Sequence, residues 1–177
     1  MIIGNKTRLR EKRLGDALSD YTWRIDSELS QLDAAPLLNV TFSQYLSNYT
    51  GELSYSSSSR YPFAVETLDG RHIGNCVYDD VDETRGEAEL GIMIGNRDYW
   101  DKGYGADAVT TLVNYIFRQT RLNRIYLKTL DWNTRAQKCF QKCGFTPYGH
   151  VVRDGFNFLL MEIYREQWEK QQTKVED

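Results

Sequence analysis

The sequence predicts one mixed α/β domain, and two kinds of local pattern indicate it. Asp-Gly pairs at residues 69–70 and 154–155 each separate two runs rich in β-branched and aromatic residues, which is typical of tightly turned antiparallel hairpins. Between the hairpins, apolar residues recur every three or four positions from Val109 to Phe117, the period of an amphipathic helix. The chain has 177 residues, an ordinary length for a single domain, and it shows no internal repeat.

The first third of the chain has weaker patterns. Residues 7–13 are expected to form a strand, and residues 14–23 a helix with a loose apolar stripe. Residues 41–48 have the pattern of a short capped helix, and the serine-rich run 54–59 is a polar loop of the kind that borders a substrate. Basic residues crowd the first strand, which fits either an anion-binding patch or, the interpretation we favour, a solvated edge strand. They are Lys6, Arg8, Arg10, Lys12 and Arg13.

From residue 63 onward the pattern predicts an ordered series of elements. The expected elements are strands at 63–68 and 73–78, a polar turn at 79–85, a strand at 88–94, a helix from about residue 106, a strand at 125–130, a helix at 134–143 ended by Gly144, and a hairpin of 148–153 with 156–164. Alternating strands and helices of this kind imply a sheet covered by helices.

Composition excludes several classes of protein. The chain is 41% hydrophobic and 27% charged, without the apolar stretch of about 20 residues that a membrane span needs. With 22 Lys and Arg against 25 Asp and Glu, the net charge of −3 gives no global basic field for nucleic acid. Residues 1–13 are too charged for a signal peptide, so we expect a cytoplasmic protein without a membrane or nucleic-acid partner.

Cysteine and histidine are too sparse for a metal centre or a nucleophilic pair. Three cysteines contain no Cys-x-x-Cys motif, and Cys139 and Cys143 are spaced to share one helix face as small buried side chains. His72 beside a turn and His150 in a late strand have no partner in sequence, and we expect both to be structural. No metal site is predicted.

The sharpest chemical feature is a glycine turn, Lys102-Gly103-Tyr104-Gly105-Ala106, between a strand and a helix. Glycines let backbone N–H groups approach a ligand, and a helix N-terminus favours an anion such as phosphate. The turn lacks the Gly-Lys-Ser/Thr of a Walker A loop and the third glycine of a dinucleotide fingerprint. By itself it fits a structural role, a tight turn or a C-cap, somewhat better than a ligand site.

Two longer motifs give the turn a context. Residues 89–108 read ELGIMIGNRDYWDKGYGADA, and residues 133–145 read NTRAQKCFQKCGF. The first resembles the acetyl-CoA motif of GNAT-superfamily N-acetyltransferases, especially the branch of ribosomal-protein N-terminal acetyltransferases, and the second is similar to that family's Asn-x-Arg-Ala helix. Residues 161–168 resemble its final strand. The resemblance covers about residues 7–168 and identifies residues 1–177 as a single acyl-CoA N-acyltransferase domain.

The resemblance implies a splayed, mostly antiparallel sheet of about seven strands with helices on both faces. Acetyl-CoA would lie in the gap between strands 88–94 and 125–130, with the backbone of Ile92 and Ile94 pairing with its pantetheine arm. Asn133 would contact the cofactor, cap the following helix, or do both. By the same resemblance the pyrophosphate would rest on Lys102, Gly103, Tyr104, Gly105 and Ala106.

Acetyl transfer to an amine needs the amine in its neutral form. A lysine-like amine with a pKa of about 10.4 is almost wholly protonated at pH 7, and an α-amine with a pKa near 8 is about 10% neutral. A base is therefore useful for either, and Glu89 lies on the strand beside the gap. We predict Glu89 as the catalytic base or amine-binding carboxylate, with Glu87 on the same face in reserve. A solvated ion pair is the structural alternative for Glu89.

Two residues depart from the family pattern. Phe140 stands where many relatives have a tyrosine that protonates the departing thiolate, and Asp101 stands where relatives usually have glycine. Asp101 would repel a diphosphate if it pointed at it, and could cap the helix if it pointed away. These departures motivate an alternative function, a non-catalytic or regulatory acyl-CoA-binding protein. A weaker third hypothesis is an interaction module that uses the basic first strand.

The expected acceptor is a primary amine, either of a small molecule or of a protein N-terminus. The family places its acceptor loops within residues 20–60, where acidic residues indicate a mild preference for cationic acceptors. They are Asp20, Asp26, Glu28 and Asp33. The sequence leaves a homodimer open.

Overall fold

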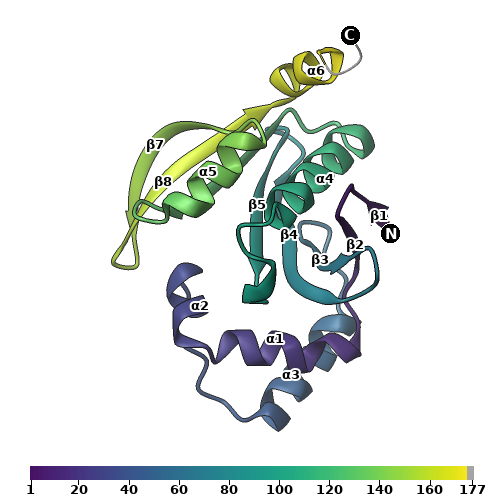
Figure 1. Ribbon diagram of the computed structural model, residues 1–177, viewed down its shortest axis with the longest axis vertical. Coiled ribbons are helices and arrows are strands. Elements are labelled where there is room, and N and C mark those ends of the chain that lie inside the picture. Colours follow the sequence, from purple (N-terminus) through teal and green to yellow (C-terminus); the bar gives the residue numbers. More distant parts are fainter. Residues whose placement is uncertain (175–177) are drawn as a thin grey trace.

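The structure is a computed structural model that describes residues 1–174 and is built around one eight-stranded sheet (Figure 1). The strand order is β1-β2-β3-β4-β5-β6-β8-β7. The strands are β1 (Ile2–Ile3), β2 (Thr7–Glu11), β3 (Tyr61–Thr67), β4 (His72–Asp82), β5 (Glu87–Ile94), β6 (Arg124–Leu130), β7 (Thr146–Arg153) and β8 (Phe156–Tyr164). The expected mixed sheet is confirmed, and it gains the short β1, which the sequence patterns did not indicate.

Six α-helices accompany the sheet over the described residues. They are α1 (Ala17–Arg24), α2 (Ser27–Leu32), α3 (Phe42–Ser54), α4 (Tyr104–Gln119), α5 (Thr134–Lys142) and α6 (Arg165–Thr173), with short 3-10 turns at Leu14–Asp16 and Arg97–Tyr99. Figure 1 shows α4 and α5 lying along the sheet, and α1 to α3 gathered at its lower end. Within residues 1–174 no helix combines the length and apolar character that crossing a membrane requires.

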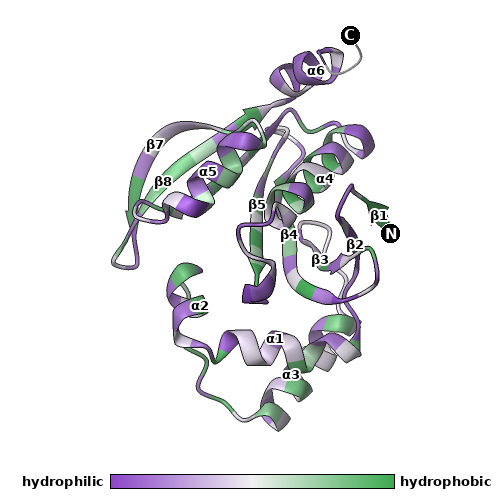
Figure 2. Cartoon of the chain, viewed as in Figure 1, coloured by the Kyte–Doolittle hydropathy of each residue, from purple (hydrophilic) through white to green (hydrophobic). Residues whose placement is uncertain are grey.

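The core lies between α4 and the central strands. Leu112 and Ile116 of α4 and Ile125 and Ile163 of the strands are fully buried in one cluster, as the helical spacing predicts. Figure 2 shows hydrophobic residues along the central strands and on part of α4, whereas α6 is mostly hydrophilic. The core therefore fixes α4, and with it the glycine turn, against the middle of the sheet.

The sheet splits between β5 and β6. These strands are parallel and pair only at their first residues, with Glu89 opposite Tyr126 as the last pair, while β6 pairs with β8 along its whole length. All other neighbouring strands are antiparallel. Beyond Glu89, β5 therefore makes no strand pairing with β6. The expected gap between the two strands is confirmed.

Two expected boundaries are wrong, and one helix was not expected. The predicted polar turn at 79–85 begins too early, because β4 continues to Asp82 through an irregular pairing with β5. The predicted final strand ends at Tyr164, because Trp168 belongs to α6, where its indole N–H donates to Asn114 at 2.7 Å. The six-residue α2 lacks a periodic signal and was not expected. Each error falls where tertiary contacts decide the local structure.

The solvated edge strand is also wrong. β2 lies between β1 and β3, Arg10 is buried, and Arg8 and the neighbouring Lys12 are half-buried, each in an ion pair. Arg10 contacts Glu66 at 2.5 Å and Asp16 at 2.7 Å, and Lys12 contacts Asp20 at 2.6 Å. The sequence shows the basic residues but does not predict which acids pair with them, because those acids lie on other elements.

Candidate active site

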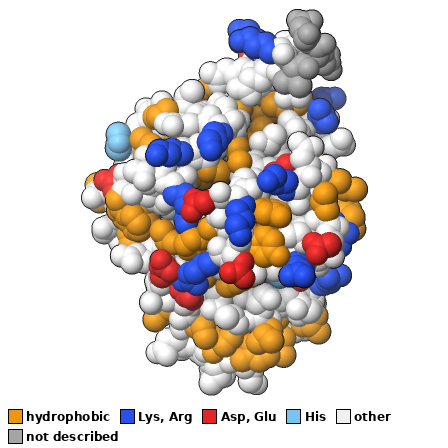
Figure 3. Space-filling model, in the orientation of Figure 1, with side chains coloured by type: hydrophobic (Ala, Val, Ile, Leu, Met, Phe, Trp, Pro, Cys, Tyr) orange, Lys and Arg blue, Asp and Glu red, His pale blue; other side chains and the backbone are white. Residues whose placement is uncertain are grey.

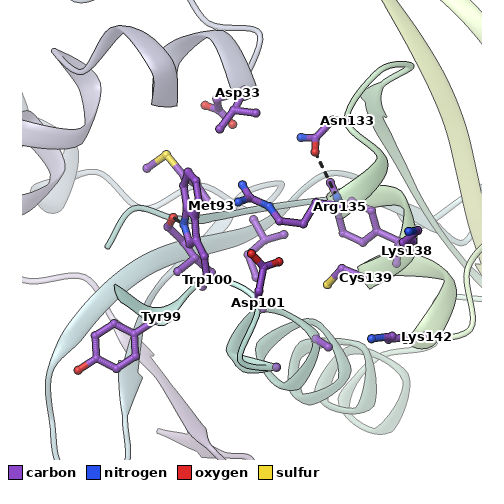
Figure 4. Close-up of a pocket in the computed structure, with 18 of the residues that line it drawn as sticks. Asp33, Met93, Tyr99, Trp100, Asp101, Asn133, Arg135, Lys138, Cys139 and Lys142 are labelled. Atoms are coloured by element: carbon purple, nitrogen blue, oxygen red, sulfur yellow. Dashed lines mark hydrogen bonds between the residues drawn. The ribbon is translucent and has the colours of Figure 1, made fainter. Parts of the chain in front are cut away.

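A cleft of about 330 Å³ opens where β5 and β6 separate (Figure 4). Its walls come from the end of β5, the glycine turn and first residues of α4, one face of α5, and α2. The residues that line the cleft include Asp33, Ile92, Met93, Ile94, Trp100, Asp101, Gly103, Gly105, Ala106, Asn133, Arg135 and Phe140. Figure 3 shows basic and acidic side chains gathered across the middle of this face of the molecule.

The glycine turn leaves the N-terminus of α4 open to a ligand. Gly103 is the N-cap at φ 84°, and no side chain caps the helix. Asp101 also has a positive φ, 56°, which explains why glycine suits this position and why Asp is one of the few other residues that tolerate it. Of the two alternatives for Asp101, the capping of α4 is therefore wrong. Its side chain lines the cleft instead.

The β1–β2 turn is clamped onto this helix end. The carboxylate of Asp107 accepts hydrogen bonds from the backbone N–H groups of Asn5, Lys6 and Thr7 at 2.8–3.0 Å. Lys6 consequently reaches the glycine turn, where its Nζ donates to the carbonyl of Lys102 at 2.8 Å. The sequence indicated Lys6 as part of a possible anion-binding patch but not its place beside the glycine turn, because its partners are about a hundred positions away.

Aromatic and basic side chains join α5 to the loop after β5. The guanidinium carbon of Arg135 lies 3.7 Å from the centre of the Trp100 ring. The indole N–H of Trp100 donates to the carbonyl of Ile94 at 2.7 Å. Lys138 and Lys142 line the same side of the cleft. Sequence reasoning missed these residues, and their only signal was the helical spacing that puts 135, 138 and 142 on one face.

Six of the eight predicted cofactor residues line this cleft. Its lining includes Ile92, Ile94, Gly103, Gly105, Ala106 and Asn133. Lys102 and Tyr104 belong to the same turn but lie outside the lining: the Nζ of Lys102 donates to the carbonyl of Asp98 at 2.6 Å, and the ring of Tyr104 packs edge-on against Tyr99. Contact of all eight residues with acetyl-CoA stays a prediction.

Asn133 is the N-cap of α5, as expected. Its side-chain oxygen accepts from the backbone N–H of Ala136 at 3.2 Å. The same residue lines the cleft, so the capping role leaves a cofactor contact open.

The predicted base, Glu89, lies just outside the cleft lining. Side chains alternate along a strand, so Glu89 shares a face of β5 with Met93, opposite Ile92. Lys128 of β6 donates to Glu89 Oε1 at 2.5 Å, and Glu89 also lies beside the carboxylates of Asp79 and Asp80. The ion pair that was the structural alternative for Glu89 is present. The catalytic role of Glu89 stays a prediction.

The reserve candidate Glu87 is held further from the gap. It accepts a hydrogen bond from the guanidinium of Arg124 at 3.0 Å, and Arg124 also binds Glu162 of β8 at 2.7 Å. This ion-pair network ties β5, β6 and β8 together where the sheet is still continuous. Glu87 therefore stabilises the part of the sheet where β5 and β6 are still paired.

Phe140 both lines the cleft and packs in the core. Its exposed fraction is 7%, and its ring meets Phe145 at a centroid distance of 6.0 Å. Cys139 lines the cleft, whereas Cys143 is buried and its thiol donates to the carbonyl of Ala106. His72 lies away from the cleft among buried carboxylates, with its Nδ1 3.6 Å from Asp16, and its expected structural role fits this position.

Comparison with known proteins agrees with this geometry. Residues 6–146 match the family model described as an acetyltransferase (GNAT) domain. An uncharacterized N-acetyltransferase p20 of Bacillus licheniformis is 30% identical over 149 residues, which is 82% of each chain. The spermidine N(1)-acetyltransferase of Vibrio cholerae is 28% identical over 94 residues, 53% of this chain and 54% of that protein.

A solved structure extends the comparison to the fold. The crystal structure of spermidine N-acetyltransferase from Vibrio cholerae in complex with CoA and spermine superposes with a TM-score of 0.82 at 20% identity, covering 92% of this chain and 98% of that one. At this identity the likeness concerns the fold.

Proposed function

The chain belongs to the GNAT acetyltransferase family, and from that premise we propose that it acetylates a primary amine of a small molecule in a ternary complex at the β5–β6 cleft. It is an N-acetyltransferase that uses acetyl-CoA as its co-substrate. The observation that carries the proposal is that the unpaired end of β5 and the open N-terminus of α4 line one cleft. Acetyl-CoA needs both features, a gap beside a strand for its thioester-bearing arm and a helix N-terminus for its diphosphate.

The residues around the cleft suit an acyl-CoA. The backbone N–H groups of α4 and the positive end of its dipole favour a diphosphate. Lys6, Lys138 and Lys142 add positive charge at the same end. The unpaired edge of β5 at Ile92 to Ile94 leaves backbone groups for an extended amide-bearing arm. Asp101, which also lines the cleft, is an unfavourable charge at this end.

The transfer step requires a neutral amine. Its nitrogen bonds to the acetyl carbon, the carbon–sulfur bond breaks, CoA leaves as the thiolate, and the amine nitrogen gives one proton to a base. We propose Glu89 for that base, acting directly or through water, because it lies on the face of β5 that also carries Met93 of the cleft. Phe140 offers no proton, and the neighbouring Cys143 together with burial raises the pKa of the Cys139 thiol, so solvent protonates the thiolate.

A small-molecule acceptor has the better support among the acceptors that the sequence allows. The spermidine acetyltransferase named above acts, by its name, on a small polyamine. A protein N-terminus, the ribosomal-protein branch of the family and a homodimer stay predictions without such support.

Thiol release tests the proposal. Acetyl-CoA is mixed with the protein and a panel of small amines and N-terminal peptides, release of CoA thiol is followed, and the product is identified by mass. We expect amine-dependent release with a product heavier by one acetyl group. Binding of acetyl-CoA without release on any amine would favour a non-catalytic acyl-CoA-binding protein. No binding at millimolar acetyl-CoA would contradict the cofactor assignment.

A further inference from the structure

We propose that Asp33 pairs with a second positive charge on the acceptor, so that the enzyme prefers diamines and longer polyamines over monoamines. The inference rests on the proposed function and names the substrate class of the same cleft. Asp33 thereby determines specificity and positions the acceptor, while the acetylated nitrogen itself reacts elsewhere in the cleft.

The first step of the argument is the fate of the four acids expected near the acceptor. Asp26 and Glu28 are both bound by Arg97, at 2.9 and 2.5 Å. Asp20 is bound by Lys12 at 2.6 Å and by the amide of Asn75 at 2.7 Å. Across residues 1–174 the side chain of Asp33 makes neither an ion pair nor a hydrogen bond. Asp33 is therefore the acid of this group that is free to bind a ligand.

The second step is its placement. Asp33 lines the cleft together with Leu29 and Leu32 of α2. Arg97 fixes this short helix to the loop after β5, and Leu29 is buried, so the wall that carries Asp33 is held on two sides. Figure 4 shows Asp33 above Met93, a residue on the same face of β5 as Glu89. Lys128, which donates to Glu89, is also close enough to act on the charge of Asp33, so the carboxylate and the predicted base lie toward the same part of the gap.

The local sequence pattern is unfavourable at this point, which is typical of functional positions. Asp33 is the C-cap of α2, where the helix dipole disfavours a negative charge. The next residue, Ala34, has φ 50°, a conformation that costs a residue with a Cβ. Neither feature serves packing of the carboxylate, since Asp33 is exposed to the cleft.

The third step is the division of charge along the cleft. The cationic side chains Lys138 and Lys142 lie on α5, and Figure 4 shows Lys142 and Asp33 at opposite ends of the labelled side chains. A phosphate-bearing cosubstrate fits the basic end. An acceptor that carries a positive charge fits the end with Asp33, and such complementarity orients two substrates against each other.

The surroundings of Asp33 also disfavour its ionised form, which a bound cation would stabilise. Desolvation by the surrounding protein raises the pKa of Asp33 above its ordinary value, and the charges of Arg24 on α1 and Lys128 on β6 offset this only in part. Arg135 on α5 also faces the cleft but is stacked on Trp100. An ammonium group placed beside Asp33 would stabilise its ionised form.

The test compares linear monoamines and diamines of equal carbon number as acceptors. The variants are Asp33→Asn, Asp33→Glu and, as a matched control of the same charge change far from the cleft, Glu169→Gln on α6. For the wild type we expect kcat/KM to be at least ~10-fold higher for diamines. Asp33→Asn should raise the KM for diamines by about 10- to 100-fold, the range for hydrogen bonds to charged groups, with KM for monoamines and acetyl-CoA unchanged. Asp33→Glu should restore part of the preference.

Two results would overturn the inference while leaving the proposed function intact. One is thiol release with no diamine preference in the wild type. The other is an equal loss for monoamines and diamines in Asp33→Asn, measured on protein with an unchanged melting temperature. If no amine is acetylated, calorimetric titration of diamines into the CoA-saturated protein decides the question. Diamine binding that weakens in Asp33→Asn supports the site without transfer, and equal affinities of wild type and variant reject it.

Discussion

Lys128 donates to Glu89 at 2.5 Å and so bridges β6 and β5 immediately beyond the last residue pair that joins them. The ion pair stands where the sheet begins to split. It holds the carboxylate at the start of the gap, on the face that Met93 shares. A base at this point is close to both the strand ladder, which fixes it, and the cleft, which would hold the amine.

Glu89→Gln should lower kcat/KM at pH 7 by about 100-fold or more, the range for loss of a general base. The deficit should shrink as the pH rises, because a growing fraction of the amine is neutral without help. Glu87→Gln is the matched control, since Glu87 lies on the same face of β5 but is bound by Arg124. Rates measured over pH 6–10 check both variants. An equal deficit at every pH would make Glu89 a positioning residue, and a loss confined to Glu87→Gln would transfer the role to Glu87.

Gly105→Val should weaken acetyl-CoA binding steeply. A Cβ at Gly105 meets only ordinary contacts, 3.7 Å from Cys139 Sγ and from Ile94 Cγ1, so the fold should tolerate it while the side chain blocks approach of the diphosphate. Gly51→Val on α3 is the control, because a Cβ there meets nothing within 4 Å and the helix cost is similar. Calorimetric titration and thermal unfolding measure both. Undiminished affinity in Gly105→Val would place the diphosphate elsewhere.

Phe140→Tyr should raise kcat if its ring edge faces the thioester, because the hydroxyl would protonate the departing thiolate. Phe140 lines the cleft, so a path to the ligand exists. Phe145→Tyr is the control, since Phe145 packs against Phe140 and is buried outside the lining. That variant should lose about 1–3 kcal/mol of unfolding free energy through an unpartnered hydroxyl and gain no rate. A loss of stability without a gain in kcat in Phe140→Tyr would contradict the prediction that a hydroxyl at position 140 protonates the thiolate.

Asp16→Asn should destabilise the protein by about 3–5 kcal/mol at pH 7, because it leaves Arg10 partly unpaired in the interior. Burial by itself would raise the pKa of Asp16, but hydrogen bonds from Arg10 and from the backbone of Arg13 lower it from 3.8 to about 2.

The sign of the pH dependence follows from that shift. The stability contributed by ionised Asp16 is fully present above pH 3.8 and is lost as the pH falls towards 2. Urea unfolding at several pH values should therefore show the difference between Asp16→Asn and wild type narrowing in acid. Asp154→Asn, in an exposed turn with φ 50°, should change stability by less than about 0.5 kcal/mol. A difference for Asp16→Asn that is constant with pH would contradict the buried ion pair.

Local sequence patterns determined the elements whose signals are short-range. The amphipathic spacing of α4 and the Asp-Gly turn at 154–155, where both residues have positive φ, follow from the side chains and backbone preferences of those residues alone. The Asn133 cap of α5 and the glycine turn belong to the same group. Most residues of the cleft lining lie within these elements and the two family motifs, so the sequence predicted where the cleft would form.

Only the tertiary structure decided which charges meet. The basic residues of β2 look solvent-facing in sequence, yet Arg10 is paired with Glu66, 56 positions away. Lys6 reaches the glycine turn through Asp107. Asp33 stays available to a ligand because Arg97 and Lys12 bind the other three acids expected near the acceptor. Ion pairing depends on distances between side chains on different elements, and those distances are set by the packing of the whole fold rather than by neighbours along the chain.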